Sequence, residues 1–172
     1  QINNEASTVK WIGSKVSESH EGVVNISKGS LAIDHGTLVG GSITIDMNTI
    51  ECTDIESPKK RGYLVDHLKD EDFFNVKKFR FANINIKRAV KVKPDGNKYK
   101  ISADLTIKGI THPIVFGANV DIKGSNYVAT AKIKIDRTKW DIKYNSGSFF
   151  KDLGDKLILD EIEFDVFLIS VK

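Results

Sequence analysis

The stretch Tyr99–Ile122, YKISADLTIKGITHPIVFGANVDI, decides the fold because its apolar residues alternate with polar ones over two long runs. The alternating apolar residues are Tyr99, Ile101, Ala103, Leu105 and Ile107, then Ile114, Phe116, Ala118, Val120 and Ile122. A period of two is that of a β-strand with one buried face. Because Gly109 supplies a turn between the runs, the stretch predicts a long antiparallel hairpin with one apolar face.

The same alternation recurs elsewhere in the chain and predicts about six further strands. They fall near 9–11, 24–33, 43–47, 79–86 (with a bulge near Asn83), 127–135 and 158–168. Turn residues at His35-Gly36 and Pro94–Asn97 separate several of them. Since closing the sheet removes its exposed edges, the pattern predicts an all-β protein, a single extended eight-stranded antiparallel β-barrel.

One stretch, GYLVDHLKDEDFFNVKKFRF at residues 62–81, interrupts the strand pattern. Leu64 and Leu68 lie four residues apart, as on one face of a helix. The sequence predicts a single short α-helix over Pro58–Lys69, capped by Ser57, in the connection after the third or fourth strand. Connections of this length often carry lids, so we expect the helix and Phe73-Phe74 to close or line one end of the barrel.

Composition favours a single domain over residues 1–172, with residues 1–7 as a flexible N-terminal segment. A net charge of +3, from 26 basic and 23 acidic residues, predicts no nucleic-acid partner. The single cysteine excludes an intrachain disulfide, and the four histidines lack the spacing of a metal site. The residues from Gln1 onward show no basic, apolar leader pattern, and we expect a mature exported chain.

An eight-stranded barrel is either filled by its own side chains or holds one small ligand. Small residues on the predicted apolar faces favour a cavity: they are Gly22, Gly41, Ala103, Ala118, Ala129 and Ala131. A lipid can be held there by burial of methylene groups alone, without a polar motif. The alternative is a filled barrel that serves as a structural or protein-interaction module.

Six strings, in the same order, carry a resemblance to a known family. They are VKWIGSK (9–15) with His20 following, GGSITIDMNTI (40–50), HLKDEDFFNV (67–76), LTIKGIT (105–111), IDRTKW (135–140) and GSFFKDLGDK (147–156). The chain resembles the YceI-like family of exported bacterial polyisoprenoid-binding proteins. It departs at Asp141, where the family often has Gly.

The resemblance implies a lipocalin-like barrel, periplasmic or secreted, that holds a polyisoprenoid or other long-chain amphiphile, such as an isoprenoid quinone or a prenyl pyrophosphate. It implies a carrier without catalytic residues or a cofactor other than the bound lipid. Transient membrane contact for ligand exchange and a homodimer are further partner interactions that we expect from it. An enzyme with a site near Arg137 and His67 is a third alternative.

The candidate ligand contacts divide into an apolar and a polar set. The apolar set is Trp11, Ile43, Ile45, Met47, Leu64, Leu68, Phe73, Phe74, Phe79, Phe81, Ile133, Ile135, Trp140, Phe164 and Val166. The polar set, for a head group, is His20, His67 and Arg137, with a structural ion pair as the competing interpretation of Arg137. Alternation assigns most of the acidic residues Asp160, Glu161, Glu163 and Asp165 to a solvent face, not to a hydrolytic pair.

Overall fold

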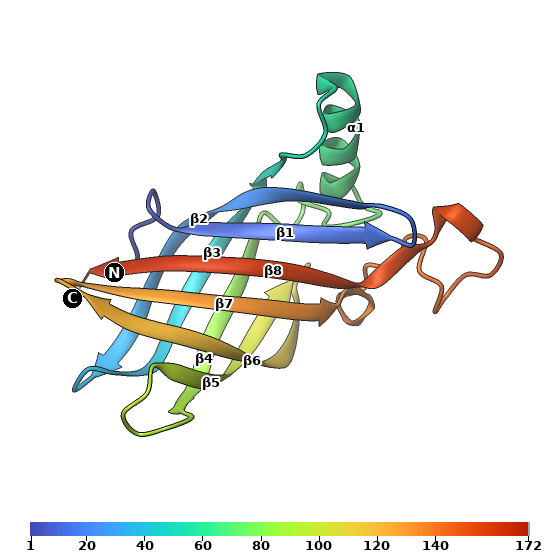
Figure 1. Ribbon diagram of the computed structural model, residues 1–172. Coiled ribbons are helices and arrows are strands. Elements are labelled where there is room, and N and C mark those ends of the chain that lie inside the picture. The colour runs from blue at the N-terminus through green and yellow to red at the C-terminus, as the bar shows by residue number, and fades with distance from the viewer. Residues whose placement is uncertain (172) are drawn as a thin grey trace.

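The computed structural model describes residues 1–171, so Lys172 lies outside the described residues. Its eight strands close into one antiparallel barrel in sequence order, with β1 pairing β8 (Figure 1). The strands are β1 (Thr8–Lys15), β2 (Ser19–Asp34), β3 (Thr37–Cys52), β4 (Phe81–Lys91), β5 (Lys98–Ile107), β6 (Ile110–Lys123), β7 (Asn126–Asp136) and β8 (Ile158–Val171). The helical segments are α1 (Pro58–Lys69) and the 3-10 turns η1 (Arg137–Trp140) and η2 (Gly154–Lys156). The predicted fold class is therefore confirmed.

The β5–β6 hairpin forms as its alternation predicts. Its ladder runs without a register shift from Lys98, opposite Asn119, to Ile107, opposite Ile110. The turn between the strands has Gly109 at φ +71°, a left-handed conformation that glycine adopts without steric cost. This hairpin contributes the inward-facing Leu105 and Ile107 to one end of the barrel.

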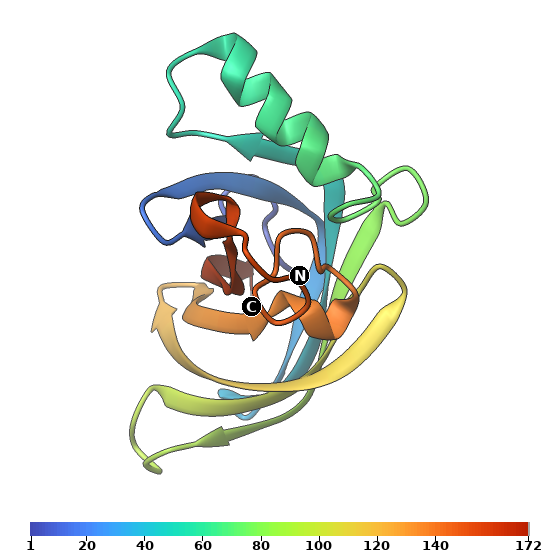
Figure 2. The same ribbon diagram turned by 90° about the vertical axis from the view of Figure 1, so that its right-hand side faces the viewer.

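Helix α1 also lies where the sequence predicts it, in the connection between β3 and β4. The side chain of Ser57 accepts a hydrogen bond from the amide of Lys60, and Pro58 occupies the first turn. The helix stands on the outside of the barrel beside β3 (Figures 1 and 2). Among the described residues, no helix has the length and apolar character needed to cross a membrane.

Two ladders stop short at the same end of the barrel, which we call the α1 end. Strands β3 and β4 pair only from Gly41 to Asp46, although β3 continues to Cys52. Strands β6 and β7 pair only from Ala118 to Lys123, so the first half of β6 runs apart from β7. The barrel is therefore less constrained by ladder hydrogen bonds at the α1 end, and segments outside the sheet cover it: α1 beside β3, and η1 beside β6.

The structure corrects the predicted start of β4. The strand begins at Phe81, so Phe79 lies in the preceding loop. The pairing with β3 is regular through Asn83, and the irregularity predicted there falls instead between Ile86 and Arg88. Ala82, Ile84 and Ile86 alternate along the strand and share its inner face, whereas Phe81 lies on the outer face. The strand therefore needs no bulge at Asn83.

The N-terminal segment 1–7, which the sequence led us to expect as flexible, is tied to the barrel in the structure. The amide of Ile2 donates to the carbonyl of Gly29, and the Asn3 amide donates to Ile169. The side chain of Ile2 is only 7% exposed. These contacts give the segment a place between β2 and β8.

Candidate functional site

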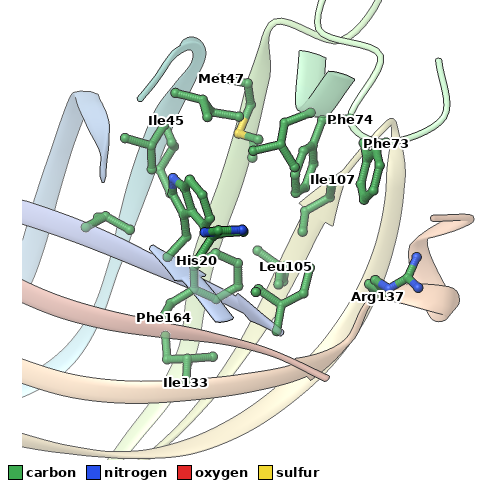
Figure 3. Close-up of a pocket in the computed structure, with 18 of the residues that line it drawn as sticks. His20, Ile45, Met47, Phe73, Phe74, Leu105, Ile107, Ile133, Arg137 and Phe164 are labelled. Carbon is green, nitrogen blue, oxygen red and sulfur yellow. The ribbon is translucent and has the colours of Figure 1, made fainter. Parts of the chain in front are cut away.

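The barrel encloses an apolar cavity at the α1 end (Figure 3). The space open to the centre of a water-sized sphere is about 160 Å³. A single buried water needs only about 10–15 Å³ on this measure. The barrel interior is therefore not filled by its own side chains, which argues against the filled-barrel alternative.

Most of the apolar candidates from the sequence line this cavity. They are Trp11, Ile43, Ile45, Met47, Leu64, Leu68, Phe73, Phe74, Ile133, Phe164 and Val166. The sequence analysis passed over further lining residues, chiefly Val9, Val24, Ile50, Ala82, Ile84, Leu105, Ile107, Ile114, Ile158, Leu159, Ile162 and Leu168. Strand parity is the signal that could have found most of them, since they share faces with the candidates.

Four apolar candidates lie outside the lining. Phe81 is 44% exposed, with the Arg80 guanidinium carbon 5.1 Å from its ring centroid, because it starts β4 with its side chain outward. Phe79 packs instead near Gly109. Ile135 is buried but does not line the cavity. Trp140, 1% exposed, donates its indole N–H to the carbonyl of Leu105 and so belongs to the packing of η1.

The small residues that led us to expect a cavity do not line it. A Cβ on Gly22 would lie 1.8 Å from the Glu51 carbonyl oxygen and 2.5 Å from the Trp11 ring. A Cβ on Gly41 would meet the Ser30 carbonyl oxygen at 2.6 Å. Both glycines therefore allow neighbouring segments to pack closely. The cavity exists as predicted, but the small residues from which we predicted it do not create it.

The connection after β3 brings α1 and Phe73-Phe74 to the edge of the cavity. Leu64 and Leu68 are half-buried and line it, while Phe73 and Phe74 are buried. His67 lies outside the lining, with its ring edge-on to Phe73 at 4.9 Å and to Tyr144 at 4.6 Å. We assign His67 to the packing of this connection.

Arg137 is completely buried at the α1 end, where it belongs to the cavity lining, and it makes four hydrogen bonds to backbone carbonyls. Nε donates to the Leu159 carbonyl, Nη1 donates to Ile142, and Nη2 donates to both Tyr144 and Ile158, all at 2.9–3.1 Å. Burial lowers its pKa from the usual value. In Figure 3 the guanidinium points away from the apolar side chains. The arginine therefore holds the segment 142–159 in place.

Alternation assigned most of the last strand's acidic residues to solvent, and Asp160 is the exception. It shares the parity of Ile158 and lies 3.9 Å from Nη2 of Arg137. The hydroxyls of Ser146 and Ser148 donate to its two oxygens. Burial alone would raise its pKa, but these hydrogen bonds and the arginine charge hold the pKa below its usual value.

His20 is the second polar candidate among the cavity-lining residues, together with Arg137 (Figure 3). Its Nδ1 lies 3.0 Å from Oδ2 of Asp54. The backbone amide of Glu21 and the thiol of Cys52 both donate to Oδ1 of Asp54. Burial would raise the pKa of Asp54, but the hydrogen bonds from Cys52 and His20 lower it overall, so the carboxylate is ionised.

One cluster outside the cavity has the composition of a metal site. The ligand atoms of His67, Asp70 and Asp72 all lie within 4.8 Å of one another. His67 Nε2 already lies 3.0 Å from Asp72, and Asp70 accepts the Asp72 amide. These hydrogen bonds, which cap the end of α1, account for the cluster without an ion.

The closed eight-stranded barrel with an apolar cavity at one end defines a class of small β-barrels that enclose a ligand-sized space. The chain belongs to the family of YceI-like domains, whose model matches residues 1–168. It is 27% identical over 123 residues to UPF0312 protein plu2095 of Photorhabdus laumondii, which covers 67% of this chain and 54% of that protein. It is 28% identical over 102 residues to Protein YceI of Salmonella arizonae, covering 55% of this chain and 48% of that protein. The chain thus spans about half the length of these curated relatives.

Solved structures share the fold. BcnA of Burkholderia cenocepacia superposes with a TM-score of 0.79 at 19% identity, covering 99% of this chain and 100% of that one. A polyisoprenoid binding domain from Saccharophagus degradans, implicated in plant cell wall breakdown, gives a TM-score of 0.69 at 13% identity, with 99% and 97% covered. At these identities the likeness concerns the fold.

Proposed function

We propose that this protein is a non-enzymatic binding or carrier protein for a polyisoprenoid or other long-chain amphiphilic lipid. The observation that carries the proposal is the apolar cavity at the α1 end, which its own side chains leave open. The polyisoprenoid-binding domain with the same fold supports this ligand class by analogy. Membership of the YceI-like family agrees with a binding role.

The energetics of burial support a lipid ligand. Each methylene moved from water into the cavity contributes about 0.8 kcal/mol, so ten contribute roughly 8 kcal/mol. Ordering the ligand offsets several kcal/mol of this, which still leaves affinity in a useful range. The site near Arg137 and His67 is poorly arranged for catalysis, because the guanidinium is bound to backbone carbonyls and His67 lies outside the cavity.

The two tryptophans provide a direct test of binding. Trp11 lines the cavity, whereas Trp140 is buried outside it. Titration with a fluorescent lipid should quench Trp11 emission in the Trp140→Phe variant, and should have much less effect on Trp140 emission in the Trp11→Phe variant. Organic extraction and mass spectrometry of the purified protein should in addition release an apolar ligand. Equal quenching of both tryptophans, or no lipid uptake at all, would count against the proposal.

We propose further that the α1 end makes transient contact with a lipid bilayer for ligand exchange. Phe149 and Phe150 are each 52% exposed, and Val16 at the β1–β2 turn is 76% exposed. They lie in segments flanking the start of β8, where Lys15 pairs with Ile158 and Leu159 lines the cavity. Exposed apolar side chains at the end of the barrel that holds the cavity are suited to shallow insertion into a bilayer.

Location and oligomeric state complete the proposal. An exported location, periplasmic or secreted, is a prediction that cell fractionation tests. A homodimer is a prediction that the molar mass in solution tests.

A further inference from the structure

The polar residues of the cavity lining gather at the turn between β1 and β2. Ser14, Lys15, Glu18 and His20 all come from this turn and the strand ends beside it. Apart from Arg137 and the backbone of Gly13, every other lining residue is apolar. An amphiphile in this cavity therefore has one place for its head group, and its chain extends toward β3, β4 and β5.

The hydrogen bonds around Asp54 fix the orientation and tautomer of His20. An ionised carboxylate only accepts hydrogen bonds, so Nδ1 of His20 donates its proton to Oδ2. In the neutral ring this leaves Nε2 as a hydrogen-bond acceptor. Its nearest ionic neighbour is Glu18, 4.0 Å away, which is beyond hydrogen-bond distance. Nε2 is thus an oriented acceptor beside the cavity.

The charges at this place do not suit a pyrophosphate. Lys15 lies 4.0 Å from Glu18, and Asp54 adds a second carboxylate beside His20. The remaining cation of the lining, Arg137, already donates to four backbone carbonyls. A pyrophosphate needs an excess of cations, whereas here the carboxylates of Glu18 and Asp54 outnumber the single lysine, and the arginine is already bound to the backbone.

We infer that His20, positioned by Asp54, binds the head group and selects a neutral hydroxyl over a pyrophosphate. The hydroxyl of an isoprenoid alcohol or phenol donates to Nε2, while the chain occupies the apolar part of the cavity. This inference rests on the proposed lipid-binding function and deepens it. It narrows the head groups that the sequence left open to those that are uncharged and carry a hydrogen-bond donor.

The test compares ligands with the same chain in competition with a fluorescent lipid. Farnesol should displace the lipid at a concentration at least tenfold lower than farnesyl pyrophosphate does. Farnesyl methyl ether, which cannot donate a hydrogen bond, should bind about as weakly as farnesol binds to the His20→Ala variant. Loss of one neutral hydrogen bond corresponds to roughly a 2- to 12-fold weaker affinity.

Variants separate the head-group contact from general damage to the cavity. His20→Ala should weaken farnesol but leave the methyl ether unchanged, and Asp54→Asn should reduce the same preference to a smaller extent. His35→Ala, on an exposed side chain, is the matched control. Equal or tighter binding of the pyrophosphate, or an equal loss for alcohol and ether in His20→Ala, would overturn the inference and leave lipid binding standing. Failure of all three ligands to bind would overturn the proposed function with it.

Discussion

Arg137 illustrates at the residue scale how a single buried charge can organise a loop. Its fork-shaped guanidinium offers five N–H donors, which suits several carbonyls at fixed positions. The carbonyls that it binds come from both ends of the segment 142–159, so one side chain fixes where that segment crosses the barrel end (Figure 2). Without it, these buried carbonyls would lack partners.

Replacing Arg137 by Ala should therefore lower the free energy of unfolding by about 3–5 kcal/mol, because it leaves buried acceptors and Asp160 without their partner. Chemical denaturation measures this change. The exposed Arg88→Ala on β4 is the control and should change it by less than about 0.5 kcal/mol. A small loss for Arg137→Ala, with weakened lipid binding, would instead favour the head-group role first expected for this residue.

At the scale of elements, α1 is a weakly attached cover. It has no fully buried residue, and its contacts with the barrel are mainly with β3. Leu64 and Leu68 nevertheless line the cavity. Phe73 and Phe74 are buried beside it, so replacing them by Ser should lower stability as well as lipid retention. Leu64 and Leu68 are therefore better positions than Phe73 and Phe74 for testing whether α1 retains the ligand.

Changing Leu64 and Leu68 together to Ser should speed dissociation of bound lipid roughly thirtyfold, because each half-buried leucine contributes on the order of 1 kcal/mol of apolar contact. Stopped-flow transfer of a fluorescent lipid to acceptor vesicles measures the rate. Tyr63 on the same helix is 63% exposed, so Tyr63→Ser should leave the rate unchanged. Identical rates in both variants would show that α1 does not retain the ligand.

At the scale of the whole molecule, the cavity and the exposed aromatic pair lie at the same end of the barrel. Replacing Phe149 and Phe150 together by Ser should reduce co-sedimentation with phosphatidylcholine vesicles at least tenfold, since each exposed Phe can bury apolar area worth about 1.5–3 kcal/mol. Affinity for a lipid monomer in solution should not change. Phe167→Ser, an exposed aromatic on β8 that pairs with Thr8 away from this end, is the control. Unchanged vesicle binding would exclude this end as the docking surface.

Site residues that follow from local sequence pattern were predicted, and those that depend on partners far away along the chain were not. Trp11, Ile43 and Phe164 follow from strand parity, which is a local property. The prediction that Phe81 lines the cavity was wrong. The start of β4 sets which way this side chain points, and that start depends on pairing with β3. The partners of Arg137 lie 5 to 22 residues away, so the sequence left its structural and ligand-binding interpretations open.

The sequence by itself determined the eight strands, the closed barrel and the single capped helix, because alternation, turn residues and capping are local signals. The tertiary structure alone decided how the cavity is formed and how the polar groups beside it are bound. The cavity lies at the α1 end, where two ladders stop short, and the His20–Asp54 contact joins residues 34 positions apart. Such features depend on strand register and long-range packing, which no local pattern encodes.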